Sequence, residues 1–183
     1  QSRSAQAIQA FPSREFYDGS LRPATGAVAG RHIDDLAGGE ALPSDLRSPV
    51  SFHHVDGDGA RHTDAREAER IESIVAAYEA AGIDRSDIGV IAPFRAQVTE
   101  IDQRLPDGVT VDTVDRFQGS SQQVIVVSFV ASGDLSGPLF EDERRLNVAL
   151  TRAKRALVLV GNRETLESRA LYARMVEWAE GVS

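Results

Sequence analysis

The stretch "QVIVVSFV", residues 123–130, decides the fold class, because its apolar residues follow one another instead of alternating with polar ones. Two further stretches, "IGVIA" (88–92) and "ALVLVG" (156–161), have the same character. A strand that is apolar on successive residues is buried on both faces, which is typical of a parallel sheet covered by helices on two sides. Each buried aliphatic side chain contributes roughly 1.5–3 kcal/mol, so we expect these stretches to form the centre of one sheet.

Amphipathic helices are predicted between the apolar stretches. After a cap at Thr63 or Asp64, one helical face collects four apolar residues: Ile71, Ile74, Val75 and Tyr78. The remaining predicted elements are short strands at 48–55 and 109–111 and helices at 4–17, around Val98 to Leu105, at 142–153 and at 163–178. The first of these helices is expected to be interrupted or restarted at Pro12.

The alternation of strands and helices predicts an α/β fold, a three-layer sandwich with a mostly parallel central sheet. We expect a single domain over residues 1–183. Within it, the Gly- and Pro-rich segment 21–49 is predicted to be an irregular surface connection. Ligands of such sheets bind beyond the carboxyl ends of the strands, which directs attention to the loops that follow or join them.

Composition limits the class of protein. The chain of 183 residues has no cysteine, which excludes a disulfide framework and a thiolate metal site. Its longest apolar run is too short to span a bilayer and its N-terminus lacks the pattern of a signal peptide. We therefore expect an intracellular, cytoplasmic protein with no membrane partner. The net charge of −8 fits either a high-salt cytoplasm or codon bias, and nineteen of the twenty basic residues are arginine.

Several catalytic motifs are absent from the sequence. The phosphate-binding loop G-x-x-x-x-G-K-[ST] is missing, and the only lysine is Lys154. No apolar stretch ends in an Asp-Glu pair suited to magnesium, no two histidines have helical i, i+4 spacing, and there is no G-x-S-x-G elbow. We expect no metal site, and neither nucleotide hydrolysis nor acyl transfer by the chain on its own.

Polar loops do adjoin the predicted strands. "VDTVDRFQGSSQ" (111–122) contains Thr113, Gln118 and Gly119, which offer a hydroxyl, an amide and a close approach of backbone to a ligand. A tight connection with an Asx-type turn explains the same residues equally well. "APFRAQV" (92–98) places an aromatic, Phe94, where a base could stack, although a core position is the commoner use of such a residue.

The stretch "RRLNVALTRAKRALVLVGN" (144–162) is rich in arginine and contains no acid. On a helix, Arg145 and Arg152 share a face, and Arg152 falls in the last turn. Interaction with the helix dipole, worth about 0.3–1 kcal/mol, would account for one or two such residues. It leaves unexplained the small and polar residues among them, and the alternative is a bound anion.

Taken together, these segments resemble the second RecA-like domain of superfamily 1 helicases, in the group that contains the nonsense-mediated-decay RNA helicase and the replication helicase–nuclease. "IGVIAPFRAQV" is similar to motif IV of that group, "VDTVDRFQGSSQQVIVVS" to motif V, and "RRLNVALTRAKRALVLVGN" to motif VI. "AIQAFPSREFYDGSL" resembles the segment that joins the two domains, and "QSRS" just before it is similar to the end of the Gln-Tyr-Arg motif of the group. The similarity covers residues 1–30 and 85–165, and only a general plan extends over 31–84.

The resemblance implies roles at an ATP site. Arg152 would be an arginine finger that reaches the γ-phosphate, which is commonly worth about 10³–10⁵ in rate, and Arg3 a second contact to that phosphate. Gln118, Gly119 and Ser121 would lie against the nucleotide. The family usually has Glu at the position of Ser121, where it holds the ribose, so affinity for the nucleotide is expected to differ here. The family also has an aromatic at position 2, where this chain has serine.

The resemblance also implies contacts with single-stranded nucleic acid, from Thr113 and from the turn formed by Pro93 and Phe94, with Gln97 one helical turn further on. Arg145 is expected to form an ion pair with Asp115. DNA is slightly favoured over RNA as the partner, although contacts to a 2′-hydroxyl are not identifiable from the sequence.

The implied protein is the C-terminal motor domain of an ATP-dependent helicase, which uses ATP and Mg²⁺ only together with a first RecA-like domain in cis, upstream of residue 1. The isolated chain is then expected to be inactive, because it lacks the phosphate loop and the magnesium site. Two rival hypotheses remain at this stage: a non-catalytic RecA-like module that binds nucleic acid or protein, and a free-standing nucleotide-binding sandwich of flavodoxin type.

Overall fold

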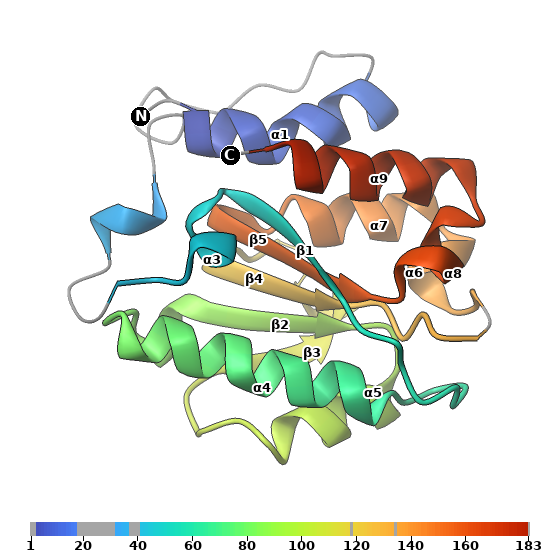
Figure 1. The fold of residues 1–183 in the computed structure, drawn as a ribbon, viewed down its shortest axis with the longest axis horizontal. Coiled ribbons are helices and arrows are strands. Elements are labelled where there is room, and N and C mark those ends of the chain that lie inside the picture. Colours follow the sequence, from blue (N-terminus) through green and yellow to red (C-terminus); the bar gives the residue numbers. More distant parts are fainter. Residues whose placement is uncertain (1–2, 18–31, 37–40, 118, 134, 183) are drawn as a thin grey trace.

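The computed structural model describes residues 3–17, 32–36, 41–117, 119–133 and 135–182, with the side chains of residues 3–5 excepted. Its centre is a five-stranded sheet in which every strand pairing is parallel, in the order β1-β5-β4-β2-β3 (Figure 1). The strands are β1 (Val50–His54), β2 (Ile88–Ala92), β3 (Thr110–Thr113), β4 (Gln122–Ser128) and β5 (Ala153–Gly161). The three continuous apolar stretches therefore form the three inner strands, as predicted.

Helices cover both faces of the sheet, which gives the expected three layers (Figure 1). One face packs against α1 (Arg3–Phe16), α6 (Pro138–Glu141), α7 (Glu143–Leu150) and α9 (Ala170–Gly181). The other face packs against α3 (Ser44–Arg47), α4 (Ala65–Ala80) and α5 (Arg95–Asp102). Short turns of helix complete the described elements: η1 (Ile33–Asp35), η2 (Arg85–Asp87), η3 (Val114–Phe117) and α8 (Arg163–Glu167).

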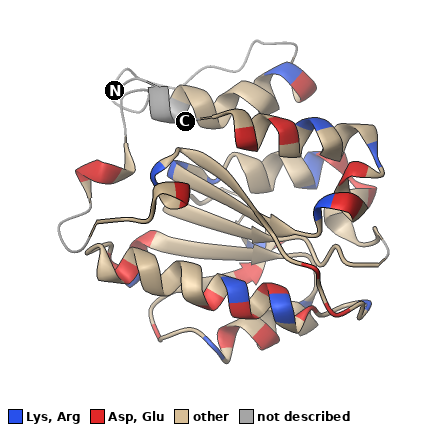
Figure 2. Ribbon diagram, in the orientation of Figure 1, with Lys and Arg blue, Asp and Glu red and all other residues tan. Residues whose placement is uncertain are grey.

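Along each inner strand, successive side chains point alternately to the two faces of the sheet and join different cores. In β4, Ile125 and Val127 face the α1 and α7 layer, whereas Val124 and Val126 face the α4 and α5 layer. This alternation is why a strand buried on both faces has to be apolar at every position. The inner strands contain charged residues only near the start of β5, at Lys154 and Arg155, so they are drawn mostly without charge in Figure 2.

Three sequence-based predictions are corrected. Helix α1 continues through Pro12, because the neighbouring Phe11 is fully buried and stacks on Trp178 with ring centroids 5.1 Å apart, and this packing outweighs the lost backbone hydrogen bond. The predicted closing helix 163–178 is two helices, α8 and α9, and the predicted helix 142–153 ends at Leu150.

The segment 21–49, predicted to be an irregular surface connection, is described by the structure at 32–36 and 41–49. These parts contain the short turns η1 and α3, and the buried side chains of Ile33, Leu42 and Leu46 join the core of the α4 layer. None of the described helices combines the length and the apolarity that crossing a bilayer requires.

Because all strands are parallel, the sheet has two distinct ends. We call the end where the strands begin the amino edge and the end where they finish the carboxyl edge. The arrowheads in Figure 1 point to the carboxyl edge.

Candidate functional site

The predicted site residues divide between the two edges, and this corrects the expectation that all would lie beyond the carboxyl ends of strands. Gly119 and Ser121 precede the start of β4, and Arg152 precedes the start of β5, so these three lie at the amino edge. Phe94 follows β2 and Thr113 ends β3, so both lie at the carboxyl edge. The two groups are separated by the length of β4, seven residues or about 20 Å.

Arg152 is held at the amino edge by neutral acceptors. Its Nη1 donates to the carbonyl of Ser120 at 3.0 Å, and its Nε donates to the carbonyl of Val148 at 3.1 Å. Its Nη2 donates to the hydroxyl of Thr151 at 3.2 Å. The guanidinium is thus fixed in orientation by three bonds, and none of them neutralises its charge.

The surroundings of Arg152 favour an anionic ligand. Arg152 is half-buried and belongs to none of the ion pairs between described residues. Burial lowers the pKa of its guanidinium, an effect that nearby Tyr17 opposes, but arginine stays protonated in proteins. A partly desolvated, fixed cation without a carboxylate partner interacts more strongly with an incoming anion than a fully solvated one does.

The turn before β4 leaves space beside this arginine. Gly119 has a φ of +85°, a conformation that favours glycine, and a Cβ added there would meet no atom within 4 Å. Ser121 is exposed. The open turn allows a ligand to approach the backbone closely. Gln118, Ser2 and the side chain of Arg3 lie outside the described residues.

A contact that the sequence did not reveal supports α7, the helix that ends just before Arg152. Asn147 donates from its Nδ2 to the hydroxyl of Tyr17 at 2.7 Å, which joins the end of α1 to α7. Thr151 donates its hydroxyl proton to the carbonyl of Asn147 at 2.8 Å. Residues 130 positions apart are therefore linked at the point where the arginine is oriented. No local signal in either segment marks this pairing.

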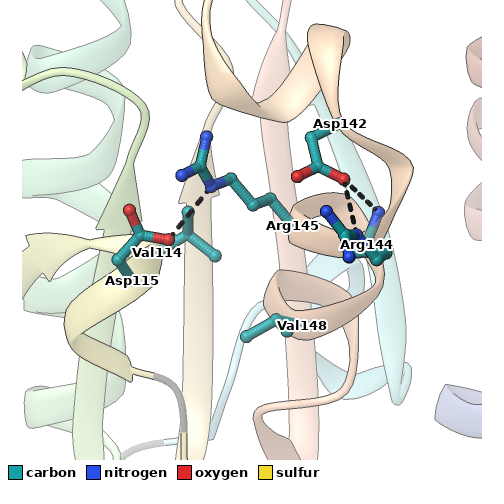
Figure 3. A pocket seen from close by; sticks show the side chains of 6 residues that line it. All are labelled: Val114, Asp115, Asp142, Arg144, Arg145 and Val148. Carbon is teal, nitrogen blue, oxygen red and sulfur yellow. Dashed lines mark hydrogen bonds and ion pairs between the residues drawn. The ribbon is translucent and has the colours of Figure 1, made fainter.

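The ion pair expected between Arg145 and Asp115 is confirmed, with Arg145 Nε 3.1 Å from Asp115 Oδ1. Figure 3 shows the two side chains pointing toward one another across a hollow of about 250 Å³, and Arg144 turned to Asp142 on its other side. Val114 and Val148 complete its lining. Two cations and two carboxylates line this hollow, so it has no excess charge to attract an anion.

Arg155 has a structural role, because its side chain is engaged by residues of two other segments. It donates to Gln123 Oε1 at 2.7 Å and to the carbonyl of His32 at 2.9 Å, and it pairs with Asp35 at 3.1 Å. Its contacts fasten the η1 segment to the start of β5.

At the carboxyl edge, β-sheet register brings two predicted segments together. Thr113 is the register partner of Ala92, the residue before Pro93, so the turn at Pro93 and Phe94 and the end of β3 are neighbours. Pro93 is buried, whereas Phe94 and Thr113 are half-buried. Arg95, the first residue of α5, pairs with Asp112 at 2.6 Å and ties the two segments to each other.

Gln97 is not available to nucleic acid, contrary to the sequence-based prediction. Its side chain is fully buried, with Oε1 accepting from the backbone N–H of Asp64 at 2.8 Å. Its Nε2 donates to the carbonyl of Asp64 and to the hydroxyl of Ser128, both at 3.1 Å. A residue one helical turn after the exposed turn points back into the protein, which periodicity alone did not indicate.

Gln97 belongs to a buried network centred on Glu67, which sequence reasoning missed. The carboxylate of Glu67 accepts from Ser128 Oγ at 2.7 Å and from the backbone N–H groups of Val130 and Ala131, both at 2.9 Å. It thereby holds the chain as it leaves β4, where Val130 has a φ of +52°. A signal was present: Glu67 lies four residues before Ile71, on the apolar face of α4.

Burial raises the pKa of Glu67 to about 7, an effect opposed by the hydrogen bonds from Ser128, Ala131 and Val130 and increased by the charge of Asp64. The fully buried carboxyl group therefore titrates near neutral pH. Among the described residues, no group of three His, Asp or Glu side chains is placed to hold a metal ion.

An all-parallel five-stranded sheet between two helical layers is the architecture of a RecA-like α/β domain. The protein family described as "AAA domain" matches residues 1–164. The chain belongs to this family, within the superfamily 1 helicase group.

Curated relatives of the chain include proteins named as helicases. The chain is 33% identical over 205 residues to "DNA polymerase alpha-associated DNA helicase A" of Saccharomyces cerevisiae, covering 98% of this chain and 29% of that protein. It is 33% identical over 193 residues to "Regulator of nonsense transcripts 1" of Caenorhabditis elegans (96% and 18%). It is 45% identical over 101 residues to "DNA replication ATP-dependent helicase/nuclease DNA2" of Bos taurus (52% and 10%). The chain thus spans less than a third of the length of each of these relatives.

Proposed function

We propose that this domain is the C-terminal motor domain of an ATP-dependent helicase that translocates on single-stranded nucleic acid inside the cell. In this proposal the domain supplies Arg152 as an arginine finger to a composite ATP site, which it shares with a first RecA-like domain in cis. Family membership supports the helicase class, and the geometry of the amino edge supports the role of the arginine.

The observation that carries the proposal is the state of Arg152. A guanidinium that is half-buried, oriented by three neutral acceptors and unpaired with any described carboxylate fits a phosphoryl group that accumulates negative charge. The open turn at Gly119 beside it leaves room for the phosphates. Arg3 is proposed as a second phosphate contact, and Gln118, Gly119 and Ser121 as residues along the nucleotide.

ATP supplies the phosphoryl group whose charge Arg152 would stabilise. Magnesium is proposed to accompany it, held by carboxylates that lie outside the described residues of this chain, since no described cluster suits a metal ion. The chain's own part in the reaction is therefore electrostatic: it places one fixed cation and an open backbone turn against the nucleotide.

The carboxyl edge is proposed as the surface for the single strand, with DNA slightly favoured over RNA. Thr113 and the Phe94 turn lie side by side there, and Thr113 can offer its hydroxyl to a phosphate. The separation of about 20 Å between the edges implies that nucleotide and strand communicate through the sheet and its helices.

Replacement of Arg152 by Ala in the full-length protein tests the proposal. The variant should lose ATP hydrolysis by about 10³-fold or more while it retains binding of single-stranded nucleic acid. Arg144→Ala is the matched control, since Arg144 lies on α7, the helix that ends just before Arg152, and its side chain is 93% exposed. Equal ATPase rates in wild type and Arg152→Ala would contradict the motor role. They would favour the second candidate, a non-catalytic module, which the exposed Ser121 in place of the family's glutamate also favours.

A further inference from the structure

The ring of Phe94 is enclosed on two sides. A Cβ added to Gly137 would lie 2.4 Å from Phe94 Cζ, so the ring rests directly on the glycine backbone. The ring of His62 lies on it with centroids 4.6 Å apart and an interplanar angle of 46°. With its sides occupied in this way, Phe94 is a support and has no free face for a base.

His62, by contrast, is exposed, and the loop that carries it is held in place. Asp58 accepts from the backbone N–H groups of Ala60 and Ala65 with its two carboxylate oxygens, both at 2.9 Å. The backbone N–H of Gly59 donates to Ser132 Oγ at 2.9 Å. The loop between β1 and α4 is thus anchored to its own helix and to the chain after β4, and it presents His62 from a fixed position.

A free positive charge adjoins this aromatic residue. Arg61 is exposed and takes part in no ion pair or hydrogen bond with the described residues. The acids nearby are engaged: Asp56 pairs with His54 at 2.8 Å, and both oxygens of Asp58 accept backbone hydrogen bonds. An exposed ring beside an unpaired arginine is the combination that binds single strands, in which bases stack on aromatic side chains and phosphates contact cations.

We propose that His62, supported from beneath by Phe94, is the surface on which a base of the single strand stacks, and that Arg61 contacts the adjacent phosphate. This inference rests on the proposed function, because it adds a binding residue to the same carboxyl edge. It moves the stacking role from Phe94, for which the position of an aromatic after a strand suggested it, to a residue in a segment where the similarity to the helicase group is only general.

The test compares two oligonucleotides of equal length, an oligothymidylate and one with abasic sugars in place of the nucleosides. Their affinities for the full-length protein are measured by fluorescence anisotropy. His62→Ala should weaken oligothymidylate binding about tenfold and leave abasic binding unchanged, since one stacked base is worth about 1–3 kcal/mol. His62→Trp should restore the affinity. Arg61→Ala should weaken both ligands and reduce the salt dependence by about one phosphate contact.

Unchanged oligothymidylate affinity in His62→Ala, equal losses on both oligonucleotides, or no binding of oligothymidylate by the wild type would each overturn the inference. Failure of the proposed function is seen separately, as ATP hydrolysis that persists in Arg152→Ala.

Discussion

The two edges of the sheet differ in how their buried or half-buried ionisable side chains are partnered. At the amino edge, Arg152 is half-buried, bound only to neutral acceptors and adjacent to open space at Gly119. At the carboxyl edge, Glu67 is fully buried and its carboxylate is saturated by three donors. One edge leaves its charge without a carboxylate partner among the described residues, whereas the other uses its carboxyl group to hold the chain that follows β4.

This difference teaches that an ionisable residue near a site need not act on a ligand. Arg152 contributes through the charge that it leaves unpaired, while Glu67 contributes through backbone geometry, including the left-handed φ of Val130. The two roles predict opposite responses to mutation: loss of activity without loss of stability at Arg152, and loss of stability first at Glu67.

The largest expected effect on stability follows replacement of Glu67 by Ala. The free energy of unfolding should fall by about 3 kcal/mol or more, because three buried donors lose their acceptor and each unsatisfied group costs about 1–3 kcal/mol. Arg152→Ala should lower it by about 1 kcal/mol or less, because the carbonyls that it releases lie near solvent. Urea unfolding of the two variants measures both values. Similar decreases in the free energy of unfolding would contradict the difference in role between Glu67 and Arg152.

Next in size is the pH dependence that Glu67 contributes. Its pKa is about 7 in the folded protein and near 4.5 in the unfolded chain, so between these values the folded state retains a proton that the unfolded state has released. The contribution of Glu67 to the free energy of unfolding therefore falls as pH rises from about 4.5 to about 7, and it levels off above about pH 7. The total decrease is up to about 3 kcal/mol.

Comparing the free energy of unfolding of the wild type with that of Glu67→Gln isolates the pH dependence that arises from Glu67. The stability of wild type relative to Glu67→Gln should decline from about pH 5 to about pH 8. Groups with a lowered pKa, such as Glu15 and Glu180, give the opposite trend in both proteins and cancel in the difference. A stability difference that stays constant with pH would show that Glu67 is charged throughout this range in both states.

A smaller effect is expected from alanine at two glycines that both have positive φ. Gly137 has a φ of +94° and supports Phe94, whereas Gly119 has a φ of +85° and open surroundings. Gly137→Ala should destabilise by about 2 kcal/mol, through strain and displacement of the ring, and Gly119→Ala by about 1 kcal/mol through strain alone. Thermal unfolding ranks the two, and the reverse order would contradict the close packing at the carboxyl edge.

The smallest effect concerns the pair of Arg145 and Asp115, which lies on the helical face between the edges. A double-mutant cycle with alanine at each position should give a coupling of about 0.2–1 kcal/mol that decreases at high salt, because both side chains are substantially exposed. Coupling that is large and independent of salt would indicate a desolvated pair.

Much of the molecule was predictable from local pattern. The inner strands, the cap of α4 at Asp64 and the Arg145–Asp115 pair were all expected and confirmed. The roles of Arg152, Gly119 and Thr113 stay predictions that the structure makes geometrically reasonable. Gln97 was assigned wrongly, because adjacency to an exposed turn was taken as exposure, while its amide is satisfied by a residue 33 positions away.

By itself, the sequence determined the fold class and the order of elements, because continuous apolar runs and helical periodicity are local properties that burial enforces. Tertiary structure alone decided which polar residues face a ligand. It divided one list of site residues between two edges, buried Gln97 and Glu67, placed Tyr17 against Asn147, and covered Phe94 with His62. The physical reason is that the hydrogen-bond partners and packing neighbours of a side chain come from distant segments, and only the folded sheet brings these together.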